Sequence, residues 1–348
     1  NSARMNAALS QKIADAEGQI ADLERKVKTI SIKKLKEAIK GKEVPNFFTY
    51  SRKHCERIKG NVSISTYKTY GVYLDKFEKW VGTKDVYFDD ITVSLLLDYL
   101  GYMSNVLKNG NTTQRYSIMI LAIMFKEAIK EEIIPEYMYP FNKLTLKKDA
   151  SKRQFLKKEQ FEAIIDYKLQ ENSKACIYRD MFIFSIFAGG LRYSDVLEIQ
   201  LKHFNEEERR IKKVIRKTGR VHQFKIGQVA LDIIQKYKRE NAEPDDFIFP
   251  IVTNAELFLK NEEYRYGFSE GTNKAANFQI RRIAKKLEIP VKISFHISRH
   301  TFATNALNNG MRIEHVSKLM DHNDISTTQI YAKIINEELD NAVDNYIY

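Results

Sequence analysis

Arginine, histidine and tyrosine side chains recur in three short segments of the second half of the chain. Arg192 follows a glycine pair, and His296 and Arg299 lie three residues apart, on one face if this segment is a helix. His322 and Tyr331 follow. A tyrosine hydroxyl can attack a phosphodiester, an arginine fork can hold two phosphate oxygens, and imidazole can move a proton. These residue types suit phosphodiester cleavage in which cationic side chains, rather than a metal, neutralise the phosphate charge.

The order and spacing of these segments resemble those of the tyrosine recombinases, also called phage-type integrases. The resemblance covers residues 180–335 and is most specific over 295–333. It rests on four motifs, which are Gly-Gly-Leu-Arg (189–192), His-x-x-Arg-His (296–300), Leu-Met-Asp-His (319–322) and Ser-Thr-Thr-Gln-Ile-Tyr (326–331), together with the turn at Gly310. No catalytic position departs from the family pattern, so the resemblance implies an active enzyme.

The resemblance also implies a role for each of these side chains. Tyr331 matches the nucleophile, which in the family forms a 3′-phosphotyrosyl link and frees a 5′ hydroxyl. Arg192 and Arg299 match the two arginines that clamp the scissile phosphate. His296 matches the residue that accepts the tyrosine proton or holds the phosphate, and His322 matches a donor to a non-bridging oxygen.

A lysine on a sheet turn completes the family's site as the general acid for the leaving oxygen. Lys217, in the Lys-Thr-Gly turn at 217–219, matches this lysine best, with Lys213 and Lys225 as alternatives. A basic hairpin that only contacts DNA is a further interpretation. Asp195 and His300 match positions that support the arginines and their neighbours without touching the phosphate.

The activity implied by the resemblance is site-specific DNA recombination, with integration or excision of a mobile element such as a conjugative transposon. Its partners would be double-stranded DNA and copies of the same chain, as a homotetramer in the synaptic complex and a monomer or dimer when free, with DNA-bending accessory proteins. No cofactor and no metal are expected. The alternatives are DNA relaxation of the type IB topoisomerase kind and a non-catalytic DNA-binding regulator on the same scaffold.

The composition independently favours a polyanionic partner. Lys and Arg total 57 against 45 Asp and Glu, which gives a net charge of +12 and a pI near 9.3. Such a surplus is typical of nucleic-acid-binding proteins, although a basic soluble protein without that function is also compatible with it. The sequence has no apolar run of membrane-spanning length, and Cys55 and Cys176 lie in amphipathic helical patterns. We expect no membrane partner, buried reduced thiols and a cytoplasmic, nucleoid-associated location in a bacterium.

Changes in pattern divide the 348 residues into four parts. A coiled-coil-like seam from Leu9 to Ile30 predicts a helical coupling segment over 1–45. Residues 46–142 predict a helical domain, which resembles the family's SAM-like core-binding domain. A basic linker follows over 143–155, and a catalytic domain with a C-terminal tail helix occupies 156–348. The first residue is not methionine, which is consistent with an upstream arm-site domain in the natural protein.

Local signals predict the elements of the two domains. Ser65, Thr92 and Asn111 are expected to begin three amphipathic helices of the core-binding domain. Apolar alternation over 209–229 around Thr218-Gly219 predicts two short strands and a turn. The predicted fold class is mainly α with a small β-sheet (α+β), the two domains forming a DNA clamp.

Basic side chains outside the catalytic motifs are candidates for DNA contact. The tail after Tyr331 is amphipathic and is expected to dock on a neighbouring protomer or to fold back on its own domain. The candidate DNA contacts are Lys68, Arg115, Lys147, Lys148, Lys152, Arg153 and Arg220.

Overall fold

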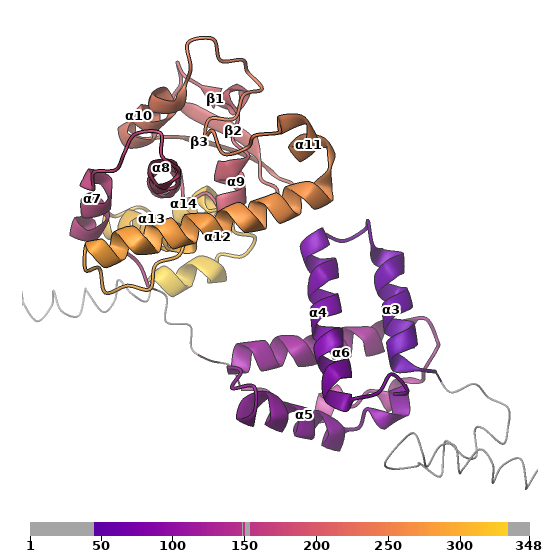
Figure 1. Ribbon diagram of the computed structural model, residues 1–348. Helices are drawn as coiled ribbons and strands as arrows, with labels where there is room; N and C mark the ends of the chain where they lie inside the picture. Colours follow the sequence, from indigo (N-terminus) through magenta and orange to yellow (C-terminus); the bar gives the residue numbers. More distant parts are fainter. Residues whose placement is uncertain (1–44, 148, 150–153, 333–348) are drawn as a thin grey trace, which may run out of the picture. The chain divides into compact units, whose positions relative to one another are not determined.

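The computed structural model describes residues 45–147, 149 and 154–332. The described chain separates into two compact units on either side of Ser151–Lys152, coloured indigo to magenta and magenta to yellow in Figure 1. It is mainly helical with one small sheet, which confirms the predicted fold class. No helix in the described ranges combines the length and apolarity that crossing a membrane requires. The predicted coupling segment up to residue 44, five of the linker residues (148 and 150–153) and the tail helix lie outside the described residues.

From residue 45 onward, the first unit contains four α-helices, namely α3 (Phe47–Ile58), α4 (Ile64–Val81), α5 (Val93–Asn105) and α6 (Asn111–Lys130). Three 3-10 turns accompany them, namely η1 (Phe88–Asp90), η2 (Glu136–Met138) and η3 (Phe141–Lys143). Thr92 caps α5 and Asn111 begins α6, as predicted. The predicted cap of α4 was wrong by two residues, because Ser63 accepts the Thr66 amide at 3.2 Å and Ser65 lies in the first turn.

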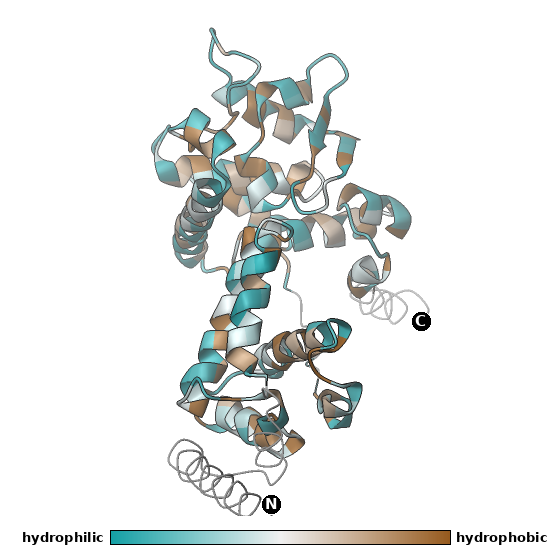
Figure 2. Cartoon of the chain, turned by 90° about the vertical axis from the view of Figure 1, so that its right-hand side faces the viewer, coloured by the Kyte–Doolittle hydropathy of each residue, from teal (hydrophilic) through white to brown (hydrophobic). Residues whose placement is uncertain are grey.

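Aromatic rings fill the core of this unit. Phe125 is fully buried, and its ring centroid lies 4.8 Å from that of Phe88, 5.8 Å from that of Phe47 and 5.2 Å from that of Phe141. The chain's single tryptophan, Trp80, packs at the edge of the same core. Hydrophilic and hydrophobic residues alternate around the helices of each unit, as expected for helices that bury one face (Figure 2).

The second unit is built around α8 (Lys174–Phe187), a largely buried helix. Its neighbours are α7 (Lys158–Asp166), α9 (Tyr193–Leu197), α10 (Gln228–Tyr237), α12 (Glu262–Lys286) and α13 (His296–Asn308) (Figure 1). The remaining elements are η4 (Leu201–His203), α11 (Ala255–Lys260) and α14 (Ile313–Leu319). Residues 326–332 are again helical.

An antiparallel sheet of order β1-β2-β3 covers one side of this unit, with strands Phe204–Asn205, Arg210–Val214 and Val221–Lys225. The two longer strands confirm the predicted hairpin. Ile211 pairs with Phe224 on the buried face, and Lys213 pairs with His222 on the same face. Val214 and Val221 are more than half exposed, so the sheet places a lysine inward and two valines outward next to the turn.

We expect Phe125→Ala to lower the free energy of unfolding of the first unit by about 3–5 kcal/mol, because it removes a fully buried ring from an aromatic core. Urea unfolding followed by Trp80 fluorescence measures this unit, since no other tryptophan is present. Tyr137→Ala is the matched control, because Tyr137 is 73% exposed. Equal midpoints for the two variants would contradict the described core.

Candidate active site

The Arg299 guanidinium, itself in the His-x-x-Arg-His motif, joins this motif to the Gly-Gly-Leu-Arg and Leu-Met-Asp-His motifs. It lies on the first turn of α13, is 4% exposed, and donates from Nη1 to the Gly190 carbonyl at 2.7 Å and from Nη2 to the Met320 carbonyl. Burial lowers the pKa of Arg299 to about 10, and the positive charge of Arg192 acts in the same direction. Arg299 therefore remains a cation at neutral pH.

The glycine pair before Arg192 allows this close approach. Gly189 and Gly190 both have a φ of +69°, a conformation that side-chain-bearing residues rarely adopt. A Cβ on Gly190 would lie 3.3 Å from Arg299 Cγ, and one on Gly189 would lie 3.2 Å from the Leu319 carbonyl. The turn between α8 and α9 thus passes directly against α13 and the end of α14. Arg192 follows as the N-cap residue of α9.

The Asp195 carboxylate lies close to both arginines, Arg192 and Arg299. It is fully buried, and its Oδ2 lies 4.0 Å from Arg192 Nη1, while its Oδ1 accepts the Arg216 amide at 3.3 Å. Burial raises the pKa of the Asp195 carboxyl, and the charges of Lys213 and Arg192 oppose that rise. Asp195 thereby links Arg192 to the backbone of the β2–β3 turn.

The β2–β3 turn carries Lys217 as an exposed side chain. Lys213, the first alternative, points to the covered face of the sheet and is 7% exposed, with its Nζ 3.8 Å from Glu198 Oε2. Lys225, the second, is exposed at the far end of β3. Of the three lysines, Lys217 is the one on the turn that Asp195 holds beside Arg192, so the geometry favours it as the general acid.

Tyr331 lies inside the unit, and only 1% of its surface is exposed. Its hydroxyl is 2.7 Å from His300 Nδ1, and its ring packs in a small cluster with Leu307, Val316 and Met320. The His296 ring meets the His300 ring edge-on, with centroids 4.6 Å apart. His300 is therefore in direct contact with the tyrosine, a closer role than the sequence predicted for it.

His322 follows α14 and Asp321, and its Nδ1 lies 2.8 Å from Thr328 Oγ1. This contact joins the histidine to the helical turn that carries Tyr331. His322 also lines a cleft of about 910 Å³ between β3 and α14, together with Arg220 and His315. The described residues thus bring Arg192, Arg299, Tyr331 and His322 together, with His296 at the start of α13 and Lys217 on the adjoining turn.

The candidate DNA contacts that the structure describes are exposed. Lys68 on α4, Arg115 on α6 and Lys147 after η3 are exposed in the first unit, and Arg220 is exposed on the β2–β3 turn. For these residues the sequence could indicate only a positive charge, since the residue type does not show which lysines and arginines contact DNA. Lys148, Lys152 and Arg153 lie outside the described residues.

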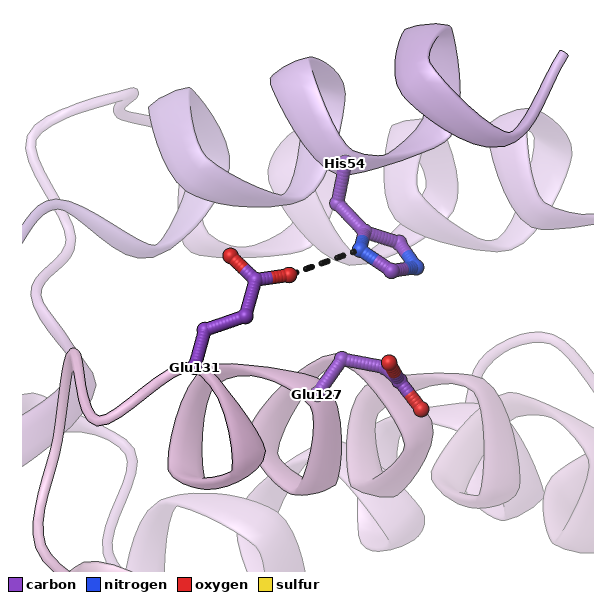
Figure 3. Close-up of side chains that lie close together, drawn as sticks. All are labelled: His54, Glu127 and Glu131. Carbon is purple, nitrogen blue, oxygen red and sulfur yellow. Dashed lines mark ion pairs between the residues drawn. The ribbon is translucent and has the colours of Figure 1, made fainter.

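One group of side chains in the described residues has the composition of a metal site. His54 on α3 and Glu127 and Glu131 on α6 converge, and His54 Nδ1 lies 3.6 Å from Glu131 Oε1 (Figure 3). Arg57 already binds both oxygens of Glu131, at 2.7 and 2.8 Å. A cation would have to displace this bidentate pair, so we interpret the group as an ion-pair network that joins α3 to α6.

In comparison with known proteins, residues 154–338 match the model of the phage integrase family. Residues 46–146 match the model of the phage integrase SAM-like domain. A tyrosine recombinase XerC from Listeria monocytogenes is 26% identical over 308 residues, covering 86% of this chain and 95% of the relative. One from Leptospira interrogans is 24% identical over 288 residues, covering 81% and 87%.

Two solved structures share the fold. The Tn1549 transposon integrase in complex with circular intermediate DNA aligns with a TM-score of 0.61 at 21% identity, covering 82% of this chain and 95% of that chain. A lambda integrase tetramer bound to a Holliday junction aligns with a TM-score of 0.63 at 15% identity, covering 92% and 86%.

We expect Asp195→Ala to lower the free energy of unfolding of the second unit by about 3 kcal/mol, because it leaves the charges of Lys213, Arg192 and Arg299 without their shared counterion. Urea unfolding followed by far-ultraviolet circular dichroism, with Trp80 reporting the first unit separately, measures the change. Asp232→Ala removes an exposed carboxylate from the same unit and serves as the control. If both variants unfold at the wild-type midpoint, Asp195 does not hold the arginines.

Proposed function

The chain belongs to the phage integrase family and is a tyrosine site-specific recombinase, and we propose that it integrates or excises a mobile DNA element with Tyr331 as the nucleophile. The observation that carries the residue assignment is the position of Arg299, which is bonded to both Gly190 and Met320 and so gathers the motif segments around one buried cation. The same chemistry would serve DNA relaxation, but the family match and the XerC relatives favour strand exchange.

In the proposed reaction, the Tyr331 hydroxyl attacks the scissile phosphorus and gives its proton to a histidine. His300 can serve, since its Nδ1 lies 2.7 Å from the hydroxyl, and His296, the residue that the family resemblance assigns to this role, contacts the His300 ring. The bond from phosphorus to the 5′ oxygen breaks as Lys217 donates a proton to that oxygen. Attack on the 3′-phosphotyrosyl bond by a 5′ hydroxyl of the partner strand releases Tyr331, so no ATP is consumed.

Arg192, Arg299 and His322 would hold the non-bridging oxygens during both steps. Fixed cations of this kind act in a site that excludes water, where removing one donor commonly costs about 10²–10³ in rate. Asp195 would keep Arg192 oriented toward the phosphate through their 4.0 Å contact.

The burial of Tyr331 adds a conformational requirement. With 1% of its surface exposed, the hydroxyl is not presented to a DNA backbone. Helical residues 326–332 would therefore have to shift when the recombination site and further protomers bind, which couples cleavage to assembly. We propose a homotetramer in the synaptic complex, a monomer or dimer when free, DNA-bending accessory proteins, and action in the nucleoid of a bacterial cell.

A nicked substrate that traps the covalent intermediate tests the nucleophile. We expect the wild-type chain to form a protein–DNA adduct in EDTA and Tyr331→Phe to form none, because only the phenolic oxygen can make the phosphotyrosyl bond. Tyr264→Phe is the control, because Tyr264 lies in the same unit and stacks on Phe268 without contacting the site. An adduct formed by Tyr331→Phe would overturn the assignment.

Binding to the recombination site should weaken steeply with salt, because phosphate contacts release condensed counterions. With six or more phosphates contacted, the affinity should fall by about 10³ between 50 and 200 mM salt. Replacing one contacting residue, Lys68→Ala or Arg115→Ala, should reduce the slope of log affinity against log salt by about one. A slope near zero in the wild-type chain, measured by fluorescence anisotropy, would contradict the DNA-clamp assignment.

A further inference from the structure

The β2–β3 turn is fixed to the second unit by a contact that the proposed reaction does not use. Thr218 Oγ1 donates a hydrogen bond of 2.5 Å to Asp321 Oδ2. Thr218 directly follows Lys217, and Asp321 directly precedes His322. This contact, the Thr218–Asp321 latch, therefore joins the residue next to the proposed general acid to the residue next to a proposed phosphate donor.

Asp321 occupies an unfavourable position without this partner. Its φ is +50°, in the left-handed region where a residue with a side chain is strained. Its carboxylate also attracts the charge of Arg299, so Asp321 lies close to one of the cations that are assigned to the phosphate. The bond to Thr218 is a contact of the Asp321 side chain that offsets the strain of its backbone.

The tip of the turn, which follows Lys217, is open at Gly219. Gly219 has a φ of +68°, and no atom of the described residues would lie within 4 Å of a Cβ there. Other contacts hold the hairpin on either side of the turn tip. Before Lys217, Asp195 accepts the Arg216 amide and Arg216 Nη1 donates to Glu198 Oε1 at 2.8 Å, and on β3 His222 Nε2 meets the Leu319 carbonyl at 2.9 Å. Among the described residues, the latch is the side-chain hydrogen bond that the turn makes after Lys217.

We propose that the Thr218–Asp321 latch positions Lys217 for proton donation to the 5′ oxygen, so that Thr218 and Asp321 are positioning residues for this reaction. This inference rests on the proposed function of Lys217. Through Met320, whose carbonyl accepts from Arg299, the same segment also connects the latch to the phosphate clamp. The lysine turn and the arginine pair are thus held at one junction.

A substrate whose leaving group needs no proton distinguishes a misplaced Lys217 from a general loss of activity. We would compare cleavage of a nicked substrate carrying the normal 5′ oxygen with cleavage of one whose bridging 5′ oxygen is replaced by sulfur. A thiolate leaves without protonation because a thiol is a far stronger acid than an alcohol. Lys217→Ala should be slow on the oxygen substrate and close to wild-type on the sulfur substrate.

Thr218→Val and Asp321→Gly should show the same pattern, with the oxygen substrate slowed about tenfold, the effect of losing one hydrogen bond to a charged acceptor. Thr218→Ser and Asp321→Asn, which keep a donor and an acceptor, should restore most of the rate. Asp321→Gly also relieves the positive φ, so a slow rate in this variant cannot be assigned to a strained or unfolded chain.

Two results would contradict the positioning role of the latch. One is a wild-type cleavage rate for Thr218→Val and Asp321→Gly on the oxygen substrate. The other is an equal loss of rate on the oxygen and sulfur substrates. If Lys217→Ala is itself not rescued by sulfur, the general-acid assignment fails and the latch fails with it. Rescue of Lys217→Ala with unaffected latch variants would remove the latch alone and leave the proposed function standing.

Discussion

The buried Arg299 guanidinium is the interaction on which the rest of the site depends. Two carbonyl groups, of Gly190 and Met320, receive its hydrogen bonds, and they belong to segments far apart in the sequence. A buried cation without such partners would be strongly unfavourable. The glycine pair that lets α8 turn against α13, and the loop that ends α14, can be understood as the framework that this cation requires.

The same arrangement explains how a basic surface becomes a reactive centre. Burial lowers the pKa of Arg299, and the positive charge of Arg192 lowers it further. The nearby carboxylate of Asp195 offsets the repulsion between the two arginines. Two cations held together in this way are suited to bind a phosphate between them. Tyr331 lies in a buried cluster, in contact with His300, so under the proposed function substrate binding would be coupled to exposure of its hydroxyl.

The motif residues could be proposed from the sequence because their types and spacing match a specific family signature, and their catalytic roles stay predictions. The sequence also predicted the sheet hairpin and two of the three helix starts that it named in the first unit. It misplaced the cap of α4, since Ser63 and Ser65 have equal propensity and only the geometry of the turn selects one. The inward position of Lys213 was hidden because the apolar alternation of the hairpin, with Val214 and Val221, suggested the opposite face.

Contacts between distant segments were beyond sequence reasoning for a different reason. The His300–Tyr331 bond and the Thr218–Asp321 bond each depend on how α14 returns the chain to α13 and the sheet, which no local pattern encodes. The strain at Asp321 is likewise invisible until the backbone is known. The residues to which we assign the chemistry could thus be proposed from their types and spacing, while the contacts that position them required the fold.

The most direct test of the account is to identify the residue that carries DNA. The intermediate trapped on a nicked substrate would be digested with nuclease and protease, and the nucleotide-bearing peptide would be sequenced by mass spectrometry. We expect a single modified peptide with the 3′ nucleotide on Tyr331. A nucleotide on any other tyrosine, or on a serine, would contradict it.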